Sequence, residues 1–230
     1  MIKFACFSPH PPIILPSVGS EEDRAQVRKT IKSLEILGKE LKETKPDSII
    51  ISSPHPDWGI KVPLHFLISN LKNQNSKLQF KIQNYQTVDN LTAEISNLTV
   101  CPILTTLDSP KQHFDWGKEF YSKIKNLKLK IALIASGDMS HCLKEDGPYG
   151  FHPDGPKFDK ALIEFLKKKD IKNFLKLDEM FPEAAECGLR SFSFLLGILE
   201  KAKIDWHSEI LSYEGPFGVG YLVMNFKLGR

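Results

Sequence analysis

Two histidine residues occur in the same four-residue motif, and each follows an apolar segment of strand length. His10 and His55 both lie in the sequence SPHP, the first after Ile2–Phe7 and the second after Ser48–Ser52. A proline after each histidine disfavours helical backbone, so both imidazoles are expected in extended chain that leaves a strand. The carboxyl ends of strands in a mostly parallel sheet form ligand crevices. The repeated motif therefore predicts two imidazoles at one metal site.

Two further polar residues follow segments that are expected to be strands. His141 lies in SGDMSH after the apolar segment Lys130–Ala135, and Glu214 lies in SYEGPFGVGY near the end of the chain. If these strands are neighbours in one sheet, all four side chains converge on one crevice. Two histidines and one carboxylate form the facial triad of non-haem Fe(II) oxygenases, which leaves three coordination positions open. The remaining histidine is then suited to general acid–base work near neutral pH.

Each candidate residue also has a structural interpretation that the sequence alone leaves open. Asp138, three residues before His141, could orient it or could bond its own backbone in a turn. A glutamate in a hairpin turn, such as Glu214, is usually solvated. His152 could line the crevice or support its loop, and Cys142 could be reactive or a small buried residue. Glu186 and Arg190 are four residues apart and could form a helix pair.

The elements that position these residues indicate an α/β fold. Apolar residues recur at helical spacing through residues 21–44, and a buried strand at Ile49–Ile51 follows, which predicts a strand–helix–strand unit with parallel strands. We expect a single domain over residues 1–230, with a mixed, mostly parallel central sheet flanked by helices and the metal site at the carboxyl ends of its strands. The other expected strands are Val62–Ile68, Leu78–Ile82, Val100–Leu107, Lys130–Ala135, Trp206–Ser212 and Val219–Phe226; the other expected helices are Asn90–Ser96, 111–126 and several within Gly155–Lys203; and Asn70–Lys77 is an expected turn.

Composition excludes several classes of partner. The 230 residues carry a formal net charge of +3, and the lysines are scattered, as on solvated helix faces rather than in a nucleic-acid-binding stripe. No apolar run approaches the length of a membrane span. Four cysteines without a CxxC pair or framework spacing make disulfides unexpected and fit a reducing compartment. These features predict a cytoplasmic protein that binds neither nucleic acid nor membrane.

Longer motifs carry a resemblance to a known family. The segments SPHPPIILP, KPDSIIISSPH, SGDMSHCLKEDGPYGFHPDGPKFD, EAAECGLRS and SYEGPFGVGY together span nearly the whole chain. In these segments the chain resembles the catalytic, B-type subunit of the class III extradiol ring-cleavage dioxygenases. It looks closest to the branch that occurs beside or fused to Memo-like and radical-SAM proteins. The resemblance implies an α/β sandwich around a mixed sheet.

The resemblance also implies an activity and roles for individual residues. His10, His55 and Glu214 would bind Fe(II), and His141 would be the catalytic acid–base, with Asp138 beside it. The implied substrates are a small dihydroxylated aromatic and O2, and the ring would open beside its two hydroxyls. Zn(II) could replace Fe(II) in purified protein. Family members pair with themselves or with a small subunit, which implies a homo-oligomer or a partner subunit. The residues expected to contact the substrate are Gly137, His152 and Pro216.

One segment departs from the family pattern and keeps other functions open. Relatives in this branch often carry an LDHG-type segment, where this chain has Leu107–Asp108–Ser109–Pro110 and its nearest histidine is His113. The histidine of that segment would line the pocket or support the site. Its absence motivates an alternative function, a Memo-like metal-binding or redox-accessory protein without ring cleavage. A Zn(II) hydrolase is a further alternative, since two histidines and a glutamate also suit catalytic zinc.

Overall fold

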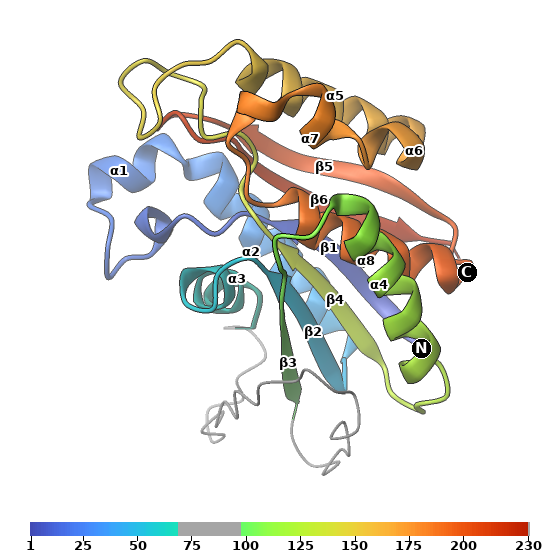
Figure 1. The fold of residues 1–230 in the computed structure, drawn as a ribbon. Coiled ribbons are helices and arrows are strands. Elements are labelled where there is room, and N and C mark those ends of the chain that lie inside the picture. The colour runs from blue at the N-terminus through green and yellow to red at the C-terminus, as the bar shows by residue number, and fades with distance from the viewer. Residues whose placement is uncertain (69–97, 230) are drawn as a thin grey trace.

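The structure is a computed structural model that describes residues 1–68 and 98–229 (Figure 1). Within these residues, six strands form one sheet in the order β3-β2-β4-β1-β6-β5. The strands are β1 (Ile2–Ser8), β2 (Ser48–Ser53), β3 (Thr99–Leu104), β4 (Ile131–Ser136), β5 (Trp206–Glu214) and β6 (Tyr221–Leu228). The expected α/β fold with a mixed, mostly parallel sheet is confirmed.

The strand directions bring the carboxyl ends of five strands to one edge of the sheet. Strands β3, β2, β4 and β1 are parallel neighbours, β6 runs antiparallel to β1, and β5 runs antiparallel to β6. Strand β5 therefore points the same way as β1. Strand β4 lies between β1 and β2, so the two strands that precede the SPHP motifs are separated by a single strand. The segments after β1, β2 and β4 consequently start side by side.

Helices cover both faces of the sheet (Figure 1). Alternate residues of each strand face one layer or the other. In β1, Phe4 and Cys6 pack in the core that contains residues of α2 (Arg28–Thr44) and α3 (Trp58–Ile68). Ala5 and Phe7 face the opposite core, which contains residues of α4 (Pro110–Ile124), α5 (Asp154–Lys168) and α8 (Leu189–Lys201). The rings of Phe7 and Phe192 stack with centroids 4.1 Å apart. The sheet is thus the middle of three layers.

The helix expected over residues 21–44 is two helices. Helix α1 (Glu21–Gln26) begins at Ser20, which forms a capping box with Asp23, and α2 begins after Val27. Val27 has φ −113° and ψ 28°, outside helical geometry, and its side chain is fully buried. A break at one buried residue leaves the apolar spacing on either side intact, so periodicity did not reveal it.

The strand expected at Val62–Ile68 was wrong, because this segment is the second half of helix α3. Nearly every side chain from Gly59 to Ile68 is buried, with Lys61 and His65 the exposed positions. A short run that is buried on most sides has no clear periodicity and cannot be told from a buried strand. Pro63 lies inside this helix. The predictions for Leu78–Ile82, Asn70–Lys77 and Asn90–Ser96 lie outside the described residues.

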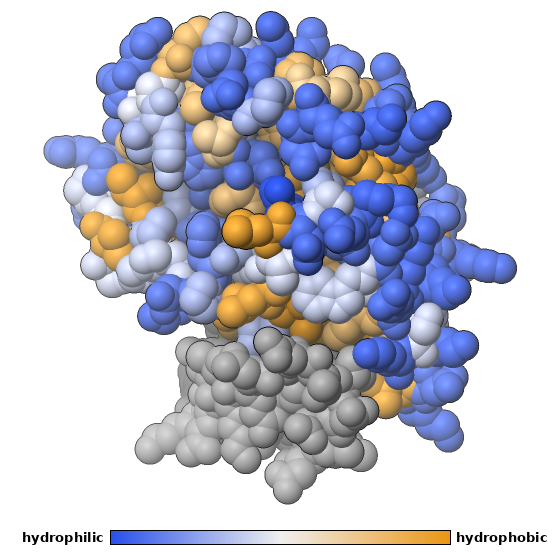
Figure 2. Space-filling model, viewed as in Figure 1, coloured by the Kyte–Doolittle hydropathy of each residue, from blue (hydrophilic) through white to orange (hydrophobic). Residues whose placement is uncertain are grey.

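The remaining expected elements are present with small shifts of their ends. The helix expected over 111–126 is α4, and the helical region after Gly155 contains α5 and α8 with short helices between them. Those short elements are α6 (Ile171–Phe174), α7 (Leu177–Met180) and the 3-10 helix η4 (Pro182–Ala184); another 3-10 helix, η1 (Pro12–Ile14), follows the first SPHP motif. The face seen in Figure 2 is mostly hydrophilic with scattered hydrophobic groups. Over residues 1–68 and 98–229, no helix combines the length and apolar character needed to cross a membrane.

Candidate metal centre

His10 is held at the end of β1 by two neighbours from the β4 side of the sheet. Its backbone N–H donates to Oδ1 of Asp138 at 2.8 Å, and its Nδ1 lies 2.9 Å from Oγ of Ser136. The side chain is buried. With Nδ1 engaged by a hydroxyl, Nε2 is the nitrogen available as a donor, which is how second partners usually orient metal-binding histidines.

His55 is fixed by a compact turn after β2. Oγ of Ser53 accepts the His55 backbone N–H at 3.1 Å and donates to the His55 carbonyl at 3.0 Å. The start of α3 packs closely on this turn, since a Cβ on Gly59 would lie 1.9 Å from Oγ of Ser53. The rings of His10 and His55 are 5.2 Å apart between centroids and nearly perpendicular. The two SPHP histidines are therefore neighbours, as their shared motif predicts.

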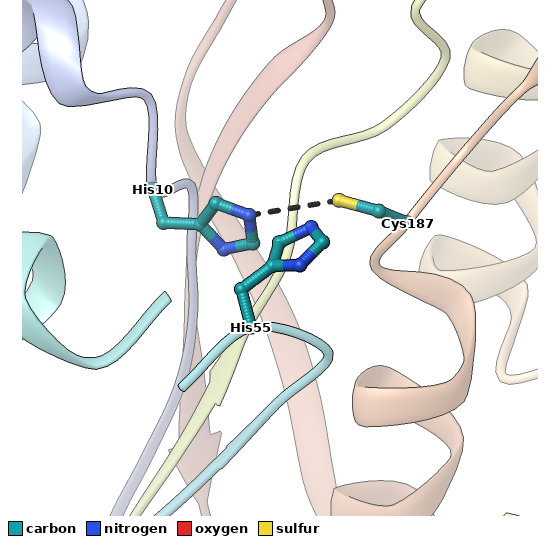
Figure 3. A group of neighbouring side chains, drawn as sticks. All are labelled: His10, His55 and Cys187. Carbon is teal, nitrogen blue, oxygen red and sulfur yellow. Dashed lines mark hydrogen bonds between the residues drawn. The ribbon is translucent and has the colours of Figure 1, made fainter. Parts of the chain in front are cut away.

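A cysteine joins this pair from the segment that leads into α8. Sγ of Cys187 lies 3.6 Å from Nε2 of His10 (Figure 3). One donor atom from each of His10, His55 and Cys187 lies within 4.8 Å of the other two. Sequence reasoning did not select Cys187. The available signal was a lone cysteine followed by glycine in EAAECGLRS.

Two glycines allow the Cys187 segment to approach the Asp138 loop. A Cβ on Gly137 would lie 2.1 Å from Cα of Gly188, and a Cβ on Gly188 would lie 2.8 Å from the carbonyl oxygen of Asp138. Across this contact the Asp138 N–H donates to Sγ of Cys187 at 3.3 Å, and the Gly188 N–H donates to the Asp138 carbonyl at 2.9 Å. Gly137 thus makes room for the cysteine segment. Its predicted contact with substrate stays a prediction.

Asp138 and His141 lie beside the same sulfur. Donor atoms of Asp138, His141 and Cys187 are mutually within 4.8 Å, and Oδ2 of Asp138 is 4.0 Å from Nε2 of His10. The His141 backbone N–H donates to the carbonyl of Ala184 at 3.1 Å, which ties the loop after β4 to the segment before α8. Nδ1 of His141 is buried and has no hydrogen-bond partner among the described residues. An unsatisfied buried nitrogen of this kind is suited to a ligand or ion.

Burial disfavours the charged forms of His10, Asp138 and Cys187. It lowers the pKa of His10 to about 3, with the neighbouring His55 lowering it further. It raises the pKa of Asp138 to about 6, against the opposing effect of the His10 N–H, and it raises the pKa of Cys187 well above its usual value. Neutral imidazole is the form that binds metals, and a bound cation would favour the carboxylate and the thiolate. The donor set therefore fits a cation.

Glu214 ends β5 at the same edge of the sheet but is directed elsewhere. Strand β5 is two positions from β1, which corresponds to about 10 Å at the usual spacing between strands. Oε2 of Glu214 accepts both the backbone N–H and the hydroxyl of Thr30, each at 2.8 Å. Thr30 lies in the first turn of α2, whose N-cap residue Val27 makes no side-chain cap. Neither donor group found among the described residues contains Glu214.

The two other predicted substrate contacts lie in loops that touch each other. The ring of His152 accepts the N–H of Asp154 at 3.2 Å through Nδ1, at the start of α5. The carbonyl of Pro216 accepts a hydrogen bond from Nζ of Lys144 at 2.7 Å, in the turn between β5 and β6. Neither residue belongs to a donor group within the described chain. Their predicted contacts with substrate stay predictions.

His113 has a structural role in the loop between β3 and α4. Its Nδ1–H donates to the carbonyl of Ser109 at 3.0 Å, and its Nε2 accepts the N–H of Thr106 at 3.1 Å. Both nitrogens are thus used to hold the loop between β3 and α4. Arg190 holds the same loop by donating to the Asp108 carbonyl at 2.8 Å, and it also pairs with Glu186 at 3.2 Å. The predicted Glu186–Arg190 pair exists, but it joins α8 to the preceding segment rather than two turns of a helix.

Comparison with known proteins places this geometry in a family. Protein CA_C1420 from Clostridium acetobutylicum is 31% identical over 270 residues, which covers 95% of this chain and 56% of that protein, so the chain spans little more than half of that relative's length. The crystal structure of the uncharacterized protein JW3007 from Escherichia coli K12 matches with a TM-score of 0.51 and 14% identity, over 96% of this chain and 98% of that one, and so supports the fold. The model for the catalytic LigB subunit of aromatic ring-opening dioxygenase matches residues 55–224, a range that contains His55, Asp138, His141, Cys187 and Glu214. The chain belongs to this LigB family.

Proposed function

We propose that the protein is a metal-dependent extradiol dioxygenase that opens the ring of a small dihydroxylated aromatic. The observation that carries the proposal is the convergence of His10, His55 and Cys187 donors at the carboxyl ends of sheet strands in a chain of the LigB family. These three residues would hold the metal, with Cys187 in the role that the sequence assigned to Glu214. Fe(II) is the metal that we propose for the reaction.

The residues around the donors fit the proton transfers of this reaction. Bound Fe(II) would supply open positions for the diol oxygens and O2. His141, whose donor atom lies within 4.8 Å of the Cys187 sulfur, would accept the proton of a diol hydroxyl and return it later. Asp138 would stabilise the protonated imidazole. A ring carbon–carbon bond beside the hydroxyls breaks and both atoms of O2 enter the product, so no external reductant is needed.

Oxygen uptake with a panel of catechols tests this proposal. Protein loaded with Fe(II) without oxygen is mixed with each diol in oxygenated buffer, and uptake is followed together with the absorbance of the ring-opened product. We expect one mole of O2 consumed per mole of diol, and loss of turnover in His141→Ala when both proteins are loaded with one equivalent of iron. Absence of any ring-opened product across the panel would make the ring-cleavage proposal wrong.

The identity of the third donor favours a second candidate function, a metal-binding or redox-accessory protein without ring cleavage. A thiolate is a softer ligand than a carboxylate. A site with two imidazoles and a thiolate therefore suits Cu(I) or Zn(II) better than a site with two imidazoles and a carboxylate, the triad of iron oxygenases. Competition between Fe(II), Zn(II) and Cu(I) without oxygen separates the two candidates. Strong preference for Cu(I) or Zn(II), together with no oxygen uptake by the iron form, would support the accessory function.

A further inference from the structure

The donors at this site form two overlapping sets. One set comprises His10, His55 and Cys187, and the other comprises Asp138, His141 and Cys187. Within each set every donor atom lies within 4.8 Å of the others, whereas the five donors do not form one such set. The sulfur of Cys187 is common to both.

We propose that Asp138, His141 and Cys187 form a second metal subsite, with the Cys187 sulfur shared between two cations. This inference rests on the proposed function for the first cation, held by His10, His55 and Cys187. It adds a second position that binds a cation of the class preferred by thiolate and imidazole, such as Zn(II) or its spectroscopic substitute Co(II).

Distances favour two positions over one crowded position. Ligands to a single Zn(II) lie about 2.0–2.3 Å from it, so two ligands of one cation are separated by at most about 4.6 Å. Since the five donors do not all lie within 4.8 Å of one another, one cation cannot contact all of them in this arrangement. Two cations sharing a sulfur would use every donor, and pairs of cations about 3.5–4 Å apart are common in enzymes.

The second set also contains a buried ring nitrogen that makes no hydrogen bond of normal geometry with the described residues. Nδ1 of His141 is buried and unpaired among the described residues, whereas Nδ1 of His10 is engaged by Ser136. Asp138 keeps one oxygen for another partner, because Oδ1 accepts the His10 N–H while Oδ2 faces the cluster, 4.0 Å from His10 Nε2. The Asp138 N–H, 3.3 Å from the Cys187 sulfur, supports negative charge on that atom. A cation at this position would therefore find a carboxylate oxygen, an imidazole and a thiolate.

Occupation of the second subsite would regulate the first. An imidazole that binds a cation cannot accept a proton, so the second cation would remove His141 from its acid–base role. Excess metal should then inhibit turnover without displacing the first cation.

Titration with Co(II) under anaerobic conditions tests the second subsite directly. Absorption bands of cobalt–thiolate bonds report each addition, and bound metal is counted after removal of the excess. We expect two equivalents in the unchanged protein, and one equivalent with thiolate absorption retained in His141→Ala and in Asp138→Asn. Cys187→Ser should lose the thiolate absorption at both additions. The electron paramagnetic resonance signal should fall at the second addition, because a shared sulfur couples the two ions.

Two control variants address binding elsewhere on the protein. His207→Gln removes an exposed imidazole on β5, and Cys142→Ser removes a buried thiol in the loop after β4. Both variants should still bind two equivalents of Co(II). A single equivalent in the unchanged protein would overturn the second subsite while leaving the first intact. Two equivalents in His141→Ala would also overturn it. Absence of any tight binding would overturn the proposed function as well.

Discussion

Sγ of Cys187 lies 3.6 Å from Nε2 of His10, across 177 residues of sequence. We therefore expect Cys187→Ala to weaken metal binding by more than about 100-fold, the upper end of the loss caused by removing residues that merely orient ligands. Glu214→Gln, at the end of β5, should bind metal as tightly as the unchanged protein. Dissociation constants from competition with a chromophoric chelator provide the measurement.

The family resemblance assigns the third ligand to Glu214, and this assignment predicts the opposite result for the two variants. If Glu214 is the third ligand, Glu214→Gln loses the metal and Cys187→Ala keeps it. Cys187→Glu serves as a further control, since a carboxylate at position 187 should restore binding and shift the preference from Zn(II) towards Fe(II).

Removal of the two histidines should separate metal binding from proton transfer. His55→Ala should lose the first cation, because it removes one of three donors. His141→Ala should keep that cation and lose turnover by about 100- to 10,000-fold, the usual contribution of a general acid or base. Metal content and turnover are measured on the same samples. Equal loss of the first cation in both variants would show that His141 is one of its ligands.

Glu214 should contribute to stability through Thr30. Its carboxylate accepts two hydrogen bonds from the first turn of α2, which has no cap of its own. We expect Glu214→Ala to lower the free energy of unfolding by about 1–3 kcal/mol, the range for lost caps and hydrogen bonds to charged groups. Glu214→Gln, which keeps an acceptor oxygen, should lose less. Urea unfolding of the metal-free protein measures both, and unchanged stability in Glu214→Ala would contradict the capping role.

The contact between Gly137 and Gly188 should be intolerant of a methyl group. A Cβ on Gly137 would lie 2.1 Å from a backbone atom, so Gly137→Ala must push the Cys187 segment away and should reduce both stability and metal affinity. Gly150→Ala is the control, because Gly150 has a positive φ but open space around it. That variant should lose about 1–2 kcal/mol from left-handed strain alone and keep its metal affinity. Normal metal affinity in Gly137→Ala would contradict this packing.

Asp159 should make stability fall as pH rises. Burial raises the pKa of this carboxyl to about 7, against hydrogen bonds from Tyr213 and Ser140. In the unfolded chain it ionises near pH 4, so the folded state holds more protons between about pH 4 and 7. Stability is therefore highest below that window, declines through it by up to about 1.4 kcal/mol per pH unit, and stays lowered above it.

Asp159→Asn should flatten that decline. The amide keeps an acceptor for the Ser140 N–H and a polar group for Tyr213, and it has no charge to bury. Urea unfolding of both metal-free proteins at pH 5, 6 and 7 gives the two slopes. Identical slopes would show that Asp159 does not carry the pH dependence, and would leave it to the other buried acids with raised pKa values, Asp138 and Glu186.

The sequence predicted most of the sheet and the histidine pair because their signals are local. A short apolar run followed by SPHP marks both a strand and its end, so His10 and His55 were placed correctly without knowledge of distant contacts. Helix α3 was missed because it is apolar on most sides.

The third donor that we propose, Cys187, could not be predicted from a local pattern. Cys187 lies beside His10 because Gly137 packs against Gly188. This contact joins segments that are distant in the sequence, so no local pattern predicts it. Glu214 was a candidate because it follows an expected strand. In the observed strand order, however, β5 lies two positions away from β1. Register and strand order decide such distances, and both depend on long-range pairing.

The donors of the proposed site lie on two kinds of segment, strand ends and a loop outside the sheet, and these segments differ in how freely they can change during evolution. His10 and His55 follow strands whose places are fixed by pairing on both sides, whereas Cys187 arrives on the segment between η4 and α8, outside the sheet. A single codon change at position 187 would exchange sulfur for oxygen while the sheet keeps its register. Lineages with this fold could thus acquire a different metal, and a different reaction, without rebuilding the protein that surrounds it.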